Sequence, residues 1–381
     1  MSPINWASSV PKKLLSKSSA AFSHFHSGHT RPLHPRQETC PNPSPGAAVL
    51  GSQISISDQG GAYARATRLS DGSILGGFTH FEGDTRILQV TKSTDGGQTF
   101  TPFGEVARGT GNIDNLFLLE IEPSVVLAAF RNHVGLGANP EYARITVCKS
   151  TDGGKTWVFS AQAFEMPGPL GLWEPFMRLG NNPGEIQLTY SQEFAPQEQR
   201  TMLTISTDQG GNWSEPKSVS WQAGLRDGMN GIAKTVDDNS REALVMVFET
   251  TKYNNKGKGF NVESAISYDD GRNWENRQDV YVPPDGRNAG APQITSFADG
   301  SLAVVFMTDE DTVAGAWPEQ ADVKVIFAAA PTGGTLCWGP PQVVGKSPSS
   351  WPGLLTIEDN KAIVTYNSGQ PIAKAFTWSP A

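Results

Sequence analysis

One short motif occurs four times along this chain, and its spacing constrains the fold more than any other feature of the sequence. The template is Ser-x-Asp-x-Gly-x-(Thr/Asn)-(Trp/Phe), and its copies occupy residues 93–100, 150–157, 206–213 and 267–274. Their first residues are 57, 56 and 61 positions apart. So regular a period is typical of proteins built from repeated structural units. We refer to these four segments as the repeat turns.

Each residue of a repeat turn has a place in a tight hairpin. The aspartate can accept backbone N–H bonds, the glycine supplies a positive φ, and the aromatic ring packs on the neighbouring sheet. Asp95, Asp152, Asp208 and Asp269 are therefore interpreted as structural rather than catalytic. A degraded fifth copy, which keeps only the aromatic residue, is expected over residues 331–338.

Two apolar, strand-like runs separated by a turn recur with the same period, and no amphipathic stretch is long enough to suggest a helix. The six pairs are residues 62–69 with 74–78, 116–121 with 125–130, 176–179 with 186–190, 232–235 with 244–248, 293–297 with 302–306, and 354–357 with 362–366. Six four-stranded units around one axis make an all-β, six-bladed β-propeller. Because the chain ends before a last fourth strand, residues 53–56 are expected to supply it and close the ring.

Residues 46–381 are accordingly predicted to form one propeller domain, preceded by a disordered or leader-like tail over residues 1–45. The tail is rich in Ser, Pro, His and basic residues and shows no apolar periodicity. It matches a secretory signal poorly, because the Leu-Leu after Lys12 and Lys13 gives way to serines rather than to an apolar core. No apolar run is long enough to span a bilayer, so no membrane partner is expected.

Charge and composition narrow the classes of ligand. Against 30 basic residues stand 38 acidic ones, for a net charge of −8, so a nucleic-acid partner is not expected. The three cysteines show no CxxC spacing, and the histidines lie in the N-terminal tail or stand alone, so neither a metal site nor a cofactor is predicted. The acidic run Asp309, Glu310 and Asp311 is interpreted as a solvated loop rather than a cation site.

Two sets of segments resemble known families. The repeat turns resemble the Asp-box (BNR) motif of sialidases, which specifies a sialidase-like fold and leaves the reaction open. Segments 171–176, 226–229, 247–250, 288–293, 306–311 and 351–354 together resemble glycoside hydrolase family 93 over roughly residues 50–375. That resemblance implies a six-bladed, exo-acting α-L-1,5-arabinanase that releases arabinobiose from the non-reducing end of linear arabinan with retention. It also implies an extracellular enzyme, and we expect a monomer.

Retaining hydrolysis requires two carboxyl groups about 5–5.5 Å apart. Glu174 opens a predicted core strand, and Glu249 ends the apolar run of the next unit. Adjacent blades can bring such residues together at the axis, and similarity assigns Glu174 as nucleophile and Glu249 as acid/base. Glu242 is the nearby alternative, discounted because it lies in a polar turn.

Further polar and aromatic residues at the heads of the predicted blades suit a furanose pocket. Sugar hydroxyls need directional donors and acceptors, and aromatic rings stack on sugar faces. The candidate substrate-binding residues are Arg65, Asn115, Trp173, Arg226, Asp227, Asn288, Gln293 and Trp351, with Trp317 as a further stacking candidate. Tyr366, at the end of a core strand, is added to the catalytic candidates.

Two alternatives to an arabinanase remain open from the sequence. A sialidase would bind its substrate carboxylate with three arginines, for which Arg65, Arg226 and Arg287 are available, although the Arg-Ile-Pro signature is missing. A propeller can also bind a glycan without catalysis, because the fold does not fix the function. Two carboxylates at adjacent blade mouths favour an enzyme.

Overall fold

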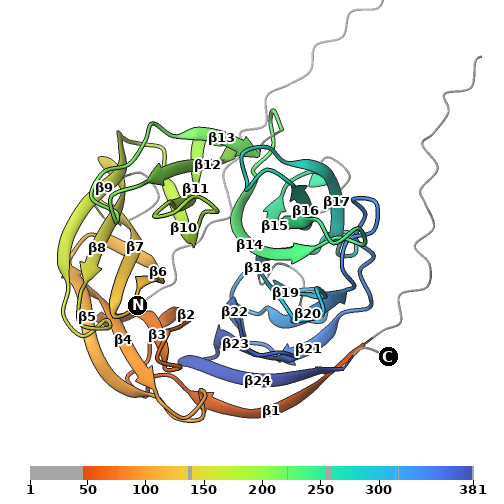
Figure 1. The fold of residues 1–381 in the computed structure, drawn as a ribbon, viewed down its shortest axis with the longest axis horizontal. Coiled ribbons are helices and arrows are strands. Elements are labelled where there is room, and N and C mark those ends of the chain that lie inside the picture. The colour runs from red at the N-terminus through yellow and green to blue at the C-terminus, as the bar shows by residue number, and fades with distance from the viewer. Residues whose placement is uncertain are drawn as a thin grey trace, which may run out of the picture. The chain divides into compact units, whose positions relative to one another are not determined.

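The computed structural model describes residues 46–135, 140–220, 222–254, 259–313, 315 and 317–379. Within these residues, six four-stranded antiparallel sheets surround a common axis like the blades of a propeller (Figure 1). The predicted all-β, six-bladed β-propeller is therefore confirmed. The tail expected over residues 1–45 lies outside the described residues. No helix in the described part of the chain has the length and apolar character needed to cross a membrane.

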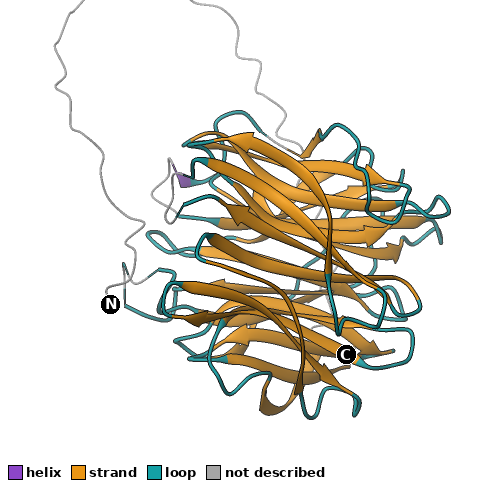
Figure 2. Ribbon diagram, turned by 90° about the vertical axis from the view of Figure 1, so that its left-hand side faces the viewer, coloured by secondary structure: helices purple, strands orange, loops and turns teal. Residues whose placement is uncertain are grey.

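Each blade is an up-and-down meander, and its four strands follow one another from the axis to the rim (Figures 1 and 2). Blades one and two contain β2 (Ala62–Arg68), β3 (Ile74–Glu82), β4 (Thr85–Ser93), β5 (Thr101–Gly109), β6 (Asn112–Glu122), β7 (Val125–His133), β8 (Tyr142–Ser150) and β9 (Val158–Pro167). Blades three and four contain β10 (Leu172–Leu179), β11 (Ile186–Ala195), β12 (Glu198–Ser206), β13 (Lys217–Ser220), β14 (Gly228–Val236), β15 (Glu242–Thr250), β16 (Asn261–Ser267) and β17 (Glu275–Tyr281). Blades five and six contain β18 (Ala289–Ser296), β19 (Leu302–Thr308), β20 (Asp322–Ala328), β21 (Gln342–Gly345), β22 (Ser350–Glu358), β23 (Lys361–Asn367), β24 (Pro371–Ser379) and β1 (Ala47–Ser55).

The ring closes through β1, which is the outermost strand of blade six and pairs antiparallel with β24. Gln53 lies opposite Lys374 and Ile54 opposite Ala373, so the predicted closing segment is confirmed. The strand begins earlier than predicted, at Ala47, and is interrupted by a register shift between Leu50 and Gln53. Pairing the two ends of the domain in one sheet gives blade six its fourth strand and covers the edge of β24.

The four repeat turns join the third and fourth strands of blades one to four. In blade two, Ser150 donates to Asp152 at 2.8 Å and the N–H of Gly154 donates to the Ser150 hydroxyl at 2.9 Å. Bonds from Thr156 and Ser150 lower the pKa of Asp152 to about 2. Gly154 has a φ of 95°, and a Cβ there would lie 2.8 Å from Leu75 of blade one. The turn thus uses its polar groups internally and docks on the preceding blade.

Apolar residues pack between neighbouring blades rather than within one sheet. One cluster, for example, joins Leu75 and Leu88 of blade one to Leu116 and Val126 of blade two, all at most 1% exposed. Packing of this kind fixes the blades relative to one another and so holds the innermost strands in place.

Candidate active site

A β-bulge occurs at the same place in the innermost strand of every blade. At each bulge two residues of the innermost strand lie opposite one residue of the second strand, as the register shifts show. The first bulged residue always has a positive φ, between 42° and 59°, although none is glycine. These six residues are Tyr63, Asn115, Glu174, Met229, Ala291 and Trp351. Backbone of this kind is sparsely populated for non-glycine residues and is concentrated at functional sites.

An aromatic residue faces every one of these bulges from the second strand. The six are Phe78, Phe130, Tyr190, Phe248, Phe306 and Tyr366, each at most 2% exposed. A bulge re-aims a side chain that a regular strand would direct into a blade interface. Each of the six bulges is therefore supported by a buried aromatic side chain. The bulges redirect one side chain per blade around the axis, and in blade three that side chain is Glu174.

Glu174 lies in the bulge of β10, between Trp173 and Pro175. In the described residues its carboxyl group has no recorded hydrogen bond or ion pair. The residue is half-buried, and the carboxyl group is surrounded mostly by protein rather than by water. This burial raises its pKa to about 8, against the lowering effect of Arg131 and with a further increase from the charge of Glu249.

Glu249 comes from the second strand of the next blade, where it pairs with Gly228 of β14. Its Oε2 accepts the N–H of Ala291 at 2.8 Å, so the bulge of blade five supplies the donor. Gly290 makes this reach possible, because a Cβ at that position would lie 2.5 Å from Oε2. Burial raises the pKa of Glu249 to about 7, while the Ala291 N–H and Arg226 act in the opposite direction.

Replacing Gly290 by Ala is expected to displace the Glu249 carboxyl group and to lower activity at least about 10-fold, because small misplacements of a reacting group are costly. The added methyl group meets the end of a flexible side chain, and φ at Gly290 is not positive, so the melting temperature should change little. Gly109→Ala is the matched control, since nothing but the Gly111 nitrogen lies within 4 Å of its new Cβ. Equal activity in both variants would contradict this account of Glu249.

Two arginines and a tyrosine complete what we term the axial cluster: Tyr63, Arg131, Glu174, Arg226 and Glu249. Arg226 acts on both glutamates and Arg131 on Glu174, in each case favouring the ionised carboxylate. Burial raises the pKa of Tyr63, whose hydroxyl group also responds to the charge of Glu174. Residues from blades one to four are therefore close enough to change one another's pKa values. The two glutamates are among them, as the sequence predicts. Because the two carboxyl groups interact and both bind protons more tightly than usual, we expect the pair to hold one proton near neutral pH.

Because the pKa of Glu174 is raised in the folded protein, the stability of the fold is expected to depend on pH. An unfolded glutamate has a pKa near 4.5, so between that pH and about 8 the folded state binds more protons than the unfolded state. Stability therefore falls as pH rises through this window. Glu174→Gln removes the titration, and its melting temperature at pH 8 should exceed that of the unmodified protein by at least about 2 °C. The two should converge at pH 4, and the exposed Glu242→Gln should show no such pH-dependent gain.

Arg131 and Tyr63 were not among the residues predicted from the sequence. Arg131 donates to Asp114 at 3.0 Å and to Asn112 at 3.1 Å, and its guanidinium lies 4.9 Å from the ring centroid of Trp173. Tyr63 occupies in blade one the bulge position that Glu174 occupies in blade three. Aligning the six units on their first strands would have exposed this equivalence.

Four of the predicted binding residues lie at or beside the bulges. Asn115 and Trp351 are bulge residues, and Trp173 immediately precedes Glu174. Arg65 lies two residues after the bulge of blade one, where it donates to the Trp351 carbonyl oxygen at 3.0 Å and stacks 3.9 Å over the Tyr63 ring. A Cβ at Gly290 would also lie 3.3 Å from Trp317, which places that ring near Glu249.

The structure gives other partners to Asp227, Asn288 and Gln293. Asp227 is fully buried, and both of its carboxylate oxygens accept from Arg277, at 2.7 and 3.0 Å. Asn288 accepts from the Phe260 N–H and donates to Asp309. Gln293 is 7% exposed and its amide contacts the Asn230 carbonyl oxygen at 3.4 Å. Such buried polar groups are accounted for by packing, so we leave these three residues out of the proposed site.

Tyr366 and Glu242 also lie apart from the axial cluster. Tyr366 is the bulge-facing ring of blade six, 1% exposed, and its hydroxyl donates to Gln53 of the outermost strand at 3.2 Å. Glu242 begins β15, whereas Glu249 lies at its far end, and it pairs with Lys234 at 2.6 Å. In the acidic run, Lys324 pairs with Glu310 and Asp311. Tyr366 is therefore better explained as a supporting residue than as a catalytic one.

No family model and no curated protein matches the chain. Solved structures do match it. An α-L-arabinofuranosidase from Fusarium graminearum shares 19% identity and a TM-score of 0.65, over 86% of this chain and 98% of the other. An α-L-arabinanase from Penicillium chrysogenum, solved with arabinobiose, shares 15% identity and a TM-score of 0.64, over 87% and 98%. An intramolecular trans-sialidase from Ruminococcus gnavus shares 11% identity and a TM-score of 0.59, over 87% and 97%.

These likenesses show a shared fold. The chain has the six-bladed, sialidase-like propeller of arabinan-degrading and sialic acid-processing enzymes, as the sequence resemblance implies. At identities below 20%, these likenesses carry the fold alone. The substrate and the mechanism are argued from the axial cluster.

Proposed function

We propose that this chain is a retaining, exo-acting glycoside hydrolase that cleaves α-1,5-linked L-arabinan from the non-reducing end and releases arabinobiose. The observation that carries the proposal is the pair Glu174 and Glu249. They come from adjacent blades, the charge of Glu249 raises the pKa of Glu174, and both have raised pKa values without an ion-pair partner among the described residues. A proton shared by two carboxyl groups near neutral pH is what acid-assisted glycoside cleavage needs.

In the proposed reaction the roles follow the resemblance to family 93: the ionised Glu174 attacks the anomeric carbon while the protonated Glu249 donates its proton to the leaving oxygen. Because the pKa of Glu174 is the higher of the two in the free protein, substrate binding has to move the shared proton from Glu174 to Glu249. The attack leaves the sugar bound to Glu174 as a glycosyl ester. Glu249 then takes a proton from the water that hydrolyses this ester, so that Glu174 is again a carboxylate and Glu249 is again protonated. Arg226 and Arg131 compensate the negative charge of the pair, and the Ala291 N–H fixes one oxygen of Glu249. A polymeric substrate that does not cross membranes accords with the proposed extracellular location.

The three arginines that a sialidase would need each have a partner within the protein, although Nη2 of Arg65 has none. Arg226 pairs with Glu193 at 2.8 Å, Arg65 binds backbone carbonyl oxygens, and Arg287 donates to the Asp309 carbonyl oxygen at 2.9 Å. No specific observation thus favours a substrate carboxylate at the axis over a neutral sugar.

Product analysis tests the proposal. Debranched arabinan is incubated with the full chain, products are separated by chromatography, and the anomer first formed is read by proton NMR. Arabinobiose of retained configuration is expected, with no release from a sialoside. Inverted product would overturn the retaining mechanism, sialoside hydrolysis would overturn the substrate, and no hydrolysis of either would leave a glycan-binding propeller as the better description.

A further inference from the structure

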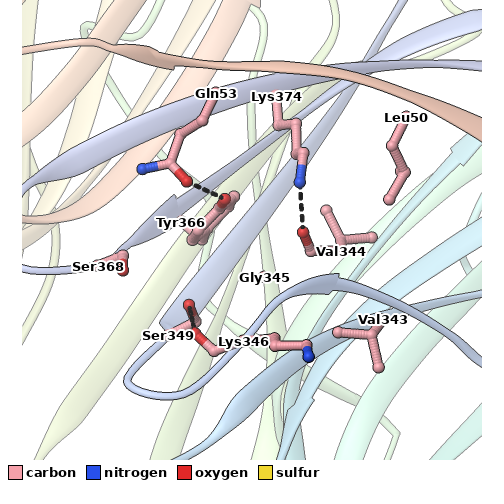
Figure 3. Close-up of a pocket in the computed structure, with 10 residues that line it drawn as sticks. All are labelled: Leu50, Gln53, Val343, Val344, Gly345, Lys346, Ser349, Tyr366, Ser368 and Lys374. Carbon is pink, nitrogen blue, oxygen red and sulfur yellow. Dashed lines mark hydrogen bonds between the residues drawn. The ribbon is translucent and has the colours of Figure 1, made fainter.

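A cavity of about 430 Å³ lies at the closure of the ring, apart from the axial cluster (Figure 3). Its walls are formed by β1 and β24 of blade six and by β21 of blade five, and Tyr366 of β23 stands between them. None of its lining residues belongs to the axial cluster. Its volume is within the range of small-molecule sites in proteins.

The cavity is positively charged in a chain whose net charge is −8. Lys346 and Lys374 line it, and its ten lining residues include no acidic side chain. Lys374 donates to the Val344 carbonyl oxygen at 2.9 Å, which occupies one of its three donors. Lys346 is exposed and reaches the cavity from the segment after β21. Two lysines without a neighbouring carboxylate in the lining favour an anion.

Neutral polar groups and an apolar wall complete the lining. The Gln53 amide and the Ser368 hydroxyl are the accessible neutral polar groups. Tyr366 and Ser349 are each 1% exposed, and their hydroxyl groups donate to Gln53 and to the Lys346 carbonyl oxygen. Leu50 and Val343 supply the accessible apolar groups of the lining, whereas Val344 is 3% exposed and packs in the core. Gly345 lets β21 approach the Tyr366 ring closely, since a Cβ there would lie 2.8 Å from that ring. Such a mixture suits a ligand that has hydroxyl groups and an apolar face as well as a charge.

We propose that this cavity is a second ligand site that binds a small hydroxylated carboxylate of the uronic acid class. The carboxylate lies between Lys346 and Lys374, the sugar hydroxyl groups meet Gln53 and Ser368, and the apolar face of the ring lies against Leu50 and Val343. The site is independent of the proposed hydrolysis, because it shares no residue with the axial cluster.

Calorimetric titration of the full chain with D-glucuronate tests the site, with D-glucose as the matched neutral sugar and inorganic sulfate as a plain anion. Binding of glucuronate with a Kd on the order of millimolar is expected, at least about 5-fold tighter than either comparison compound. Lys346→Gln and Lys374→Gln should each weaken it at least about 3-fold, and added salt should weaken it further.

The matched control is Lys361→Gln, a lysine of blade six outside the cavity, and it should leave the affinity unchanged. Lys346 is exposed, so its variant is expected to fold normally even if Lys374→Gln does not. The proposal is overturned if glucuronate fails to bind at 50 mM, if glucose or sulfate binds equally well, or if Lys346→Gln binds as tightly as the unmodified protein.

Discussion

Replacing either Glu174 or Glu249 by Gln is expected to lower kcat/KM on linear arabinan at least about 10³-fold while leaving the propeller folded. Gln keeps the shape of the side chain but can neither attack as a carboxylate nor deliver a carboxylic proton. Because the two groups act as one unit, the double variant should lose little more than the single ones. Glu242→Gln, whose exposed carboxylate pairs with Lys234, is the matched control and should retain full activity.

Alanine variants separate the two roles. With an aryl α-arabinobioside and sodium azide, Glu249→Ala should form its glycosyl-enzyme and yield an azide product of retained configuration. Glu174→Ala lacks the nucleophile, so azide should attack the substrate directly and yield the inverted product. The reverse pattern would exchange the two roles, and either Gln variant keeping more than a tenth of the activity would contradict the assignment of that residue.

The sequence was sufficient to predict the architecture because the features that determine it are local and repeated. A turn of eight residues recurs with nearly constant spacing, and buried first and second strands such as β14 and β15 have clear apolar runs. The outermost strands are harder to recognise. In β5, for example, only Val106 is buried, because the outer edge of a blade faces water. The start of β1 at Ala47 was missed for the same reason.

The candidate site was predicted less completely, because strand ends do not show which way a side chain points. Glu174 and Asp227 are both carboxylates at the head of an innermost strand. Glu174 falls in a bulge and has no recorded ion pair in the described residues, whereas Asp227 is occupied by Arg277, a residue 50 positions later. Likewise Arg131 influences Glu174 from the second strand of another blade. Contacts between units of this kind leave no periodic signal in one sequence.

Arg277 connects all four strands of blade four, which makes its loss costly. From β17 it donates to Glu263 of β16, to Thr250 at the end of β15 at 3.1 Å, and to Asp227 beside the start of β14. Glu263 and Asp227 are fully buried. Lys252 also pairs with Glu263, but the structure records no other cation for Asp227 among the described residues. Removing the guanidinium would therefore leave a buried carboxylate uncompensated.

Arg277→Met is expected to lower the free energy of unfolding by about 3–5 kcal/mol, as measured by urea denaturation. Arg108→Met is the matched control, because Arg108 makes a similar two-bonded pair with Glu105, at 2.7 and 2.6 Å, but is 55% exposed. That pair should contribute little to stability, since water screens it. Adding Asp227→Asn to Arg277→Met should recover part of the loss, because it removes the uncompensated charge. Arg226 and Glu249 directly precede Asp227 and Thr250, so the same network also holds these two residues of the axial cluster in place. Equal losses of stability in the Arg277 and Arg108 variants would show that the buried network does not hold blade four together.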